Sequence, residues 1–201
     1  MFAFVLFAVF GSVTAFPPRP CCLSRQYEVI IQTVGGTANS TNASAVNVIE
    51  GSSRLVYDGI SNRTAIYGSF RDPNGLFHPT KTINFYQQRV SYMINMTSGV
   101  CKKSMMPEHE VMHSPCIPDD ARLLASTHVG DQHKIATNTW AWEAYNATIH
   151  SINTVDGCAP VMNGYYGTGA MAFVYMNLFT NYKAGIADMG VFSLAGHACP
   201  I

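Results

Sequence analysis

Charged residues are scarce in this 201-residue sequence: only 12% are Asp, Glu, Lys or Arg, and twelve basic residues balance twelve acidic ones. A typical globular chain carries roughly 25%. A protein that neutralises nucleic-acid phosphates needs an extended basic surface, so we expect no nucleic-acid partner. Long apolar runs are missing as well, and the sequence therefore predicts no transmembrane segment.

The common catalytic signatures are also missing, since the sequence has no G-x-S-x-G motif, no P-loop and no dinucleotide fingerprint. Its acidic residues are scattered. Asp119 and Asp120 are adjacent and offer oxygens to Ca²⁺, but no EF-hand loop surrounds them. We interpret this pair as the start of a short capped helix over residues 119–126.

One metal-binding signature is present, because residues 109–113 read H-E-V-M-H and match the zinc metallopeptidase pattern H-E-x-x-H. That chemistry needs His109 and His113 on one helical face, with Glu110 as general base. Pro107 and Pro115 bracket the motif and leave barely two helical turns. We interpret it as a coincidence in a loop. A zinc metallopeptidase and adventitious surface zinc binding remain the alternatives.

The N-terminus has the pattern of a secretory signal peptide. Residues 2–10 are an unbroken apolar run too short to span a bilayer, and small residues at 13–15 suit cleavage. No Lys or Arg precedes Arg19, which departs from the usual pattern. We predict a signal peptide over residues 1–15 and one domain over residues 16–201. The alternative is a buried N-terminal strand.

Two further features favour secretion. An even number of cysteines after a signal peptide predicts up to three disulfides, with 15 full pairings open. The six are Cys21, Cys22, Cys101, Cys116, Cys158 and Cys199. N-x-S/T glycosylation sequons occur at Asn39, Asn42, Asn62, Asn95 and Asn146.

Short segments rich in Val, Ile, Thr and aromatic residues, separated by turn residues, predict an all-β fold with eight to ten strands in a sandwich or open barrel. We expect Pro160 to stop ladder pairing and residues 101–118 to form a connection. The expected strands are residues 27–34, 46–49, 54–58, 64–70, 82–90, 91–96, 134–143, 148–155 and 170–179. Apolar residues occur on both faces of several strands. That pattern fits an ordinary two-sheet core, which it favours, or curved sheets around an apolar cavity.

Several pieces, in this order and spacing, resemble the ependymin and ependymin-related family over nearly all of the mature chain. They are PRPC at 18–21, VYDG at 56–59, YMI at 92–94, CKK at 101–103, IP at 117–118, TVDGCAPV at 154–161, GIAD at 185–188, VF at 191–192 and the closing Cys199. The resemblance implies two antiparallel sheets around a deep apolar pocket, similar to bacterial lipoprotein carriers. The resemblance therefore favours curved sheets around an apolar cavity over an ordinary two-sheet core.

The resemblance also implies a secreted, glycosylated binder of lipid or another hydrophobic ligand. Relatives are often dimeric, and Ca²⁺ is linked to several. Some are lysosomal, and others belong to extracellular matrix or mineralised tissue, which suggests a role in cell–matrix adhesion. A purely structural matrix protein without an enclosed pocket is the third hypothesis.

The resemblance implies that Cys158 pairs with Cys21 or Cys22, that Cys101 pairs with Cys199, and that Cys116 takes the remaining N-terminal cysteine. The family usually has one cysteine where this chain has two, and vertebrate relatives carry a further cysteine near residues 77–85. The prolines that the family has before its last cysteine are replaced here by residues 193–198. The pairing is therefore only partly transferable.

Large side chains on strand segments are the candidates for the pocket wall, because alternation places Trp140 with Trp142, and Phe173 with Tyr175, on one strand face each. Tyr92 and Phe85 are further candidates at apolar strand positions. The alternative is that these six residues fill the inter-sheet core and contact no ligand.

Overall fold

The computed structural model describes residues 17–39, 42–71, 75–144, 146–168 and 171–200, and this part of the chain folds into one antiparallel sheet of eleven strands. The strands are β1 (Gln26–Asn39), β2 (Asn42–Asp58), β3 (Arg63–Arg71), β4 (Phe77–Phe85), β5 (Val90–Asn95), β6 (Cys101–Met105), β7 (Arg122–Val129), β8 (Ile135–Ala144), β9 (Ala147–Thr154), β10 (Pro160–Gly167) and β11 (Met171–Ala184). A 3₁₀ helix, η1 (Met189–Phe192), follows β11. The predicted signal peptide lies outside the described residues.

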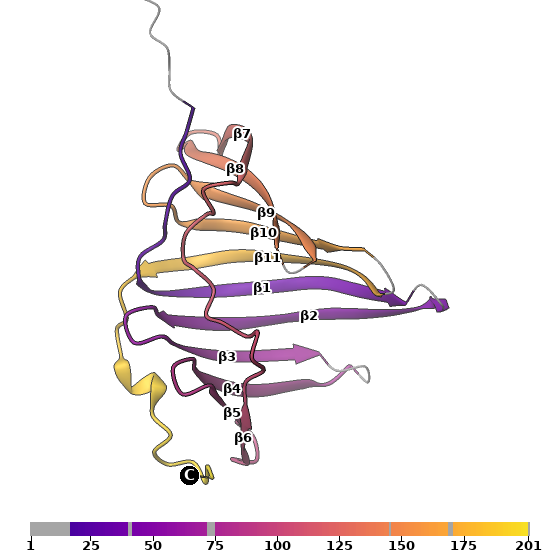
Figure 1. Ribbon diagram of the computed structural model, residues 1–201, viewed down its shortest axis with the longest axis vertical. Helices are drawn as coiled ribbons and strands as arrows, with labels where there is room; N and C mark the ends of the chain where they lie inside the picture. The colour runs from indigo at the N-terminus through magenta and orange to yellow at the C-terminus, as the bar shows by residue number, and fades with distance from the viewer. Residues whose placement is uncertain (1–16, 40–41, 72–74, 145, 169–170, 201) are drawn as a thin grey trace, which may run out of the picture.

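The sheet consists of two meanders, β1 to β6 and β7 to β11, which meet where β1 pairs with β11 (Figure 1). Their outer strands, β6 and β7, therefore lie at opposite edges of the sheet. Residues 106–121, here called the strap, connect these two edges. The strap consequently has to cross one face of the sheet, as Figure 1 shows.

The prediction of an all-β, antiparallel fold with little helix is confirmed. The expected division into two sheets is not observed, because the β1–β11 pairing joins the two meanders into one continuous sheet. Two predicted strand segments, 46–49 and 54–58, are parts of the single long strand β2. Residues 101–105, expected to belong to a connection, pair with β5 as strand β6.

Two local predictions are wrong for the same physical reason. The helix expected over residues 119–126 is absent, and β7 instead pairs with the open edge of β8. Pro160 does not end the pairing but begins β10. Proline has no amide hydrogen to donate to the neighbouring strand, and the register shift between Pro160 and Met162 accommodates this missing hydrogen bond. In both places sheet pairing outweighs local propensity.

The two faces of the sheet are covered by different irregular segments. Residues 185–200, here called the tail, pack on one face through Val191 and Phe192, which contact Val56, Ala65 and Ile83. The strap covers the other face, where Tyr27, Val29 and Tyr57 form a second buried cluster. Alternation along each strand sends neighbouring side chains to opposite faces. We call these faces the tail face and the strap face.

Three disulfides fasten these segments. Cys101–Cys199 attaches the tail to β6, and Cys22–Cys116 attaches the strap to the segment before β1. Cys21–Cys158 joins that segment to the turn before β10. This arrangement is one of the two that the resemblance implies, with Cys21 rather than Cys22 as the partner of Cys158.

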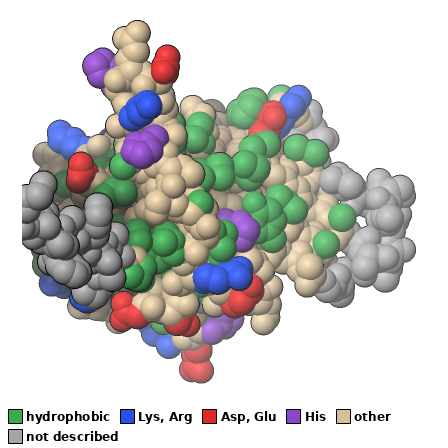
Figure 2. Space-filling view, turned by 90° about the horizontal axis from the view of Figure 1, so that it is seen from above, with side chains coloured by type: hydrophobic (Ala, Val, Ile, Leu, Met, Phe, Trp, Pro, Cys, Tyr) green, Lys and Arg blue, Asp and Glu red, His purple; other side chains and the backbone are tan. Residues whose placement is uncertain are grey.

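The surface has no extended area of one charge in the view of Figure 2, where basic and acidic side chains are interspersed among apolar and polar ones. In the described part of the chain, no helix is long and apolar enough to cross a membrane.

Candidate ligand-binding cavity

A cavity of about 570 Å³ lies between the strap and the strap face of the sheet. This volume falls within the roughly 300–1,000 Å³ of small-molecule sites. Its apolar wall comes from β1 to β3 and from β11, through Ile31, Leu55, Tyr57, Ile66 and Phe179. The strap supplies the roof, in which Met112, Pro115 and Ile117 face the strands. The strap, which is distant from these strands in the sequence, thus covers the cavity that they line.

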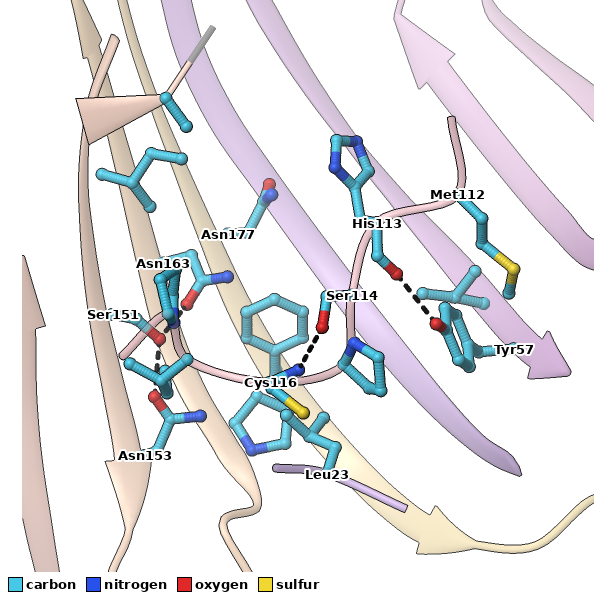
Figure 3. A pocket seen from close by; sticks show the side chains of 18 of the residues that line it. Leu23, Tyr57, Met112, His113, Ser114, Cys116, Ser151, Asn153, Asn163 and Asn177 are labelled. Atoms are coloured by element: carbon cyan, nitrogen blue, oxygen red, sulfur yellow. Dashed lines mark hydrogen bonds between the residues drawn. The ribbon is translucent and has the colours of Figure 1, made fainter. Parts of the chain in front are cut away.

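The roof is held in place at several points. The Tyr57 hydroxyl donates a hydrogen bond of 2.8 Å to the His113 carbonyl, and the Leu23 amide donates one of 2.9 Å to the Pro115 carbonyl. Cys116, the next residue, is fixed by its disulfide to Cys22. Figure 3 shows this part of the strap passing over the cavity. The strap is therefore a fixed wall along its central part.

Two stacked tyrosines line one side of the cavity. The rings of Tyr27 and Tyr57 lie 4.8 Å apart and nearly parallel, and Tyr27 is 8% exposed. Burial raises the pKa of Tyr27, and burial followed by the nearby Tyr86 raises the pKa of Tyr57. Both phenols are therefore neutral at physiological pH and contribute no charge to this side of the cavity.

Polar side chains gather on the opposite side of the cavity, on β9 and β10. The Ser151 hydroxyl lies 2.6 Å from Oδ1 of Asn153 and 2.7 Å from Oδ1 of Asn163 (Figure 3). One hydroxyl donates only one hydrogen, so Ser151 shares it between these two amide oxygens. Asn153 Nδ2 donates to the Cys158 carbonyl at 3.4 Å, and Asn163 Nδ2 donates to the Tyr165 hydroxyl at 3.3 Å. The nitrogens of both amides are therefore directed to other partners.

Of the six aromatic residues predicted for the pocket wall, Trp142 lines the cavity. Trp140 lies on the same face but is buried in a cluster with Ile117 and Cys158. Phe173 and Tyr175 stack on each other, with ring centroids 5.4 Å apart. They share the strap face with Asn177 and Phe179, but lie further along β11 and are not among the residues that line the cavity.

Phe85 and Tyr92 lie on the other face of the sheet. Phe85 packs against the cluster that the tail covers, and its ring meets that of Tyr92 edge-on at 6.1 Å. Tyr92 is the cross-strand neighbour of the buried Ile83. The sheet thus separates these two residues from the cavity.

The H-E-x-x-H segment lies in the strap and has no helical turn, so His109 and His113 are not arranged on a helical face. Within the described residues, no three His, Cys, Asp or Glu side chains come together as a metal site. Asp119 and Asp120 are exposed, and Asp120 lies at the edge of the cavity. Two residues of the motif, Met112 and His113, line the roof of the cavity.

Three of the predicted glycosylation sites fall at surface positions near turns. Asn62 and Asn146 adopt positive φ angles of 50° and 58°, which asparagine tolerates best after glycine. Asn95 ends β5 and accepts hydrogen bonds from the next turn through its side chain. The side chains of Asn39 and Asn42 lie outside the described part.

The amide groups of the cavity were missed by the sequence analysis, although a signal was present. Ser151, Asn153, Asn163 and Asn177 lie within predicted or observed strands, where asparagine is depleted. A polar residue at such a position needs a compensating interaction, either within the fold or with a ligand. The strap could not be anticipated, because residues 106–121 have no hydrophobic period.

The fold and the cavity define a class of protein: a single-sheet β protein whose strap, fastened by a disulfide, roofs an apolar cavity. The family model named Ependymin matches residues 77–197, more than half of the chain, and the chain belongs to the ependymin family. No curated protein sequence matches it significantly.

The chain is similar to two solved structures to different degrees. One, an uncharacterized conserved protein from Thermus thermophilus, superposes with a TM-score of 0.54 at 9% identity, over 89% of this chain and 91% of that chain. The other, a LolA superfamily protein from Nitrosomonas europaea, gives a TM-score of 0.34 at 8% identity, over 84% of this chain and 90% of that chain. The first similarity supports the fold alone, and the second is too low to add to it.

Proposed function

We propose that this ependymin-family protein is a secreted, non-catalytic binder that holds a lipid or another hydrophobic molecule between its sheet and its strap. The observation that carries the proposal is the cavity of about 570 Å³ with apolar walls from β1 to β3 and an apolar roof. Each buried CH₂ group of an acyl chain contributes about 0.8 kcal/mol, so affinity needs no charged clamp. The apolar N-terminus, the sequons and the three disulfides support secretion.

Trp142 provides the test of this proposal because it lines the cavity. We expect titration with oleic acid or 1-oleoylglycerol to change tryptophan emission saturably. Trp142→Ala should weaken binding about tenfold, measured with a radiolabelled ligand because the reporter is lost, without lowering the unfolding midpoint markedly. The matched control is Tyr92→Ala on the tail face, which should leave affinity unchanged. If neither lipid binds to the native protein, the proposal fails and a structural matrix role is favoured.

Calcium binding, dimer formation, a role in adhesion or matrix, and a lysosomal site stay predictions from the family resemblance.

A further inference from the structure

The polar side of the cavity is organised as one continuous row that crosses four strands. Ser151 on β9 is the cross-strand neighbour of Asn163 on β10, and Asn163 is the neighbour of Asn177 on β11. Asn177 in turn faces Thr33 on β1, whose hydroxyl donates a hydrogen bond of 2.8 Å to Asn177 Oδ1. Neighbouring strands are about 4.8 Å apart, so the row extends over about 14 Å. The side-chain hydrogen-bonding groups of these four strands are thus aligned across the sheet at one position along the strands.

The row has hydrogen-bonding capacity that the protein does not use. Asn177 Nδ2 makes no hydrogen bond to any described residue, while Asn177 Oδ1 is fixed by Thr33. This nitrogen is not among the fully buried unsatisfied atoms, and Asn177 lines the cavity, so its two hydrogens are available there. Asn163 Nδ2 donates one hydrogen to the Tyr165 hydroxyl at 3.3 Å and keeps its second amide hydrogen. The row therefore offers several donors to a ligand.

Charge around the cavity argues against an anionic ligand head. His113 is the one basic residue among the described residues that line it, and none is Lys or Arg, whereas Asp120 and Glu143 lie among them as exposed carboxylates. A carboxylate or phosphate head would lose hydration without gaining a Lys or Arg partner and would lie near like charges. An uncharged head with hydroxyl or amide groups meets neither penalty.

We propose that the cavity selects amphiphiles with an uncharged, hydroxyl- or amide-bearing head. The head bonds to the row formed by Ser151, Asn163 and Asn177, and the acyl chain lies over β1 to β3 against Ile31 and Leu55. This inference rests on the proposed function and specifies its ligand class. The two sides of Figure 3 correspond to the two parts of such a ligand, with the serine and asparagines across the cavity from Tyr57 and Met112.

The test compares three ligands with one acyl chain: 1-oleoylglycerol, oleate and methyl oleate, each titrated at pH 7.4 below its aggregation concentration. Two neutral hydrogen bonds, at about 1 kcal/mol each, correspond to roughly 30-fold in affinity. We expect 1-oleoylglycerol to bind at least tenfold more tightly than either other ligand. Equal or tighter binding of oleate would overturn the inference while leaving the proposed function intact.

Substitutions in the row provide the second readout. Asn177→Leu and Asn163→Leu should each lower the affinity for 1-oleoylglycerol about tenfold and leave that for methyl oleate unchanged or raised. The control is Gln32→Leu, an amide-to-leucine change at an exposed position on the other face of β1. Should a leucine variant fail to fold, Thr33→Val releases Asn177 and should reduce the same preference. If the leucine variants weaken the binding of all three ligands equally, the row does not recognise the head group. If the unaltered protein binds none of the three ligands, the proposed function itself is refuted.

Discussion

At the residue scale, Asp58 shows how a charge is accommodated in a sheet with few charges. Its carboxylate is fully buried at the end of β2 on the tail face. It accepts hydrogen bonds from Gln26 Nε2 at 2.9 Å, from the Ser61 amide at 3.2 Å and from Arg63 Nε at 2.8 Å. Arg63 also lies over the Phe192 ring, 4.1 Å from its centroid. Asp58 thus ties β1, β2, β3 and the tail together.

We expect Asp58→Asn to lower the free energy of unfolding by about 2–4 kcal/mol, because it leaves Arg63 without its charge partner. In the unaltered protein, burial would raise the pKa of Asp58, but the hydrogen bonds from Gln26, Arg63 and Ser61 outweigh it and lower this pKa. A carboxylate with a lowered folded-state pKa stabilises the fold above its unfolded pKa of about 3.9, and this contribution is lost as pH falls through the folded value. Urea unfolding between pH 7 and pH 3 should show a decline that is weaker in the variant. Parallel pH profiles would contradict this account.

Residue patterns predicted which side chains share a strand face, but not which face of the sheet encloses the cavity. The two-residue period of a strand places Trp140 and Trp142 on the same face, but it does not show which segment covers that face. That depends on the strap and the tail, which have no repeating pattern. Trp142 therefore lies at the cavity, whereas Phe85 packs under the tail and Tyr92 lies beside it on the same face.

At the element scale, strands with strong turn residues between them could be predicted, and those that depend on pairing could not. The β-branched residues of β9 indicate a strand from sequence alone. Residues 122–129 follow a helix-like start at Asp119 but form β7, whose backbone pairs with β8. Strand β6 was not predicted either; it is short and pairs with β5 at the other edge of the sheet. Both edge strands were therefore missed from sequence, and so was the interior strand β10, which begins at Pro160.

The strap and the tail are each fastened by one disulfide, and the two bridges make a matched pair. Cys22–Cys116 and Cys101–Cys199 have sequence separations of 94 and 98 residues, so the loop-entropy model assigns them nearly equal stabilisation of about 4–5 kcal/mol. We expect replacing either pair by serine to lower the free energy of unfolding by a similar amount, about 2–5 kcal/mol.

Their effects on binding should differ. Loss of Cys22–Cys116 frees the roof and should weaken lipid affinity at least tenfold, whereas loss of Cys101–Cys199 acts on the other face and should leave affinity within about twofold. Urea unfolding and ligand titration on both double variants separate the two effects. Equal losses of affinity would show that the tail also supports the cavity.

At the scale of the whole molecule, the cavity joins the two meanders. Its apolar wall comes from β1 to β3 in the first meander and from Phe179 on β11 in the second, while the polar row belongs mainly to β9, β10 and β11. Apart from the β1–β11 ladder, these halves are connected by the strap, by the segment before β1 and by the tail, which follows β11 and packs on the first meander. A bound ligand would therefore contact both meanders and the strap at once.

We expect a saturating ligand to stabilise both meanders together rather than one of them. At 100 times the dissociation constant, binding to the folded state contributes about 2.7 kcal/mol. For a domain of this size that corresponds to a rise in Tm of roughly 5–10 °C. Both tryptophans lie on β8, so their emission follows the second meander, whereas far-UV circular dichroism follows the whole sheet. With 1-oleoylglycerol bound, both probes should give one coincident and raised transition. If only the tryptophan transition rises and a second one stays at the ligand-free temperature, the meanders unfold separately and the ligand is held by β7 to β11 alone.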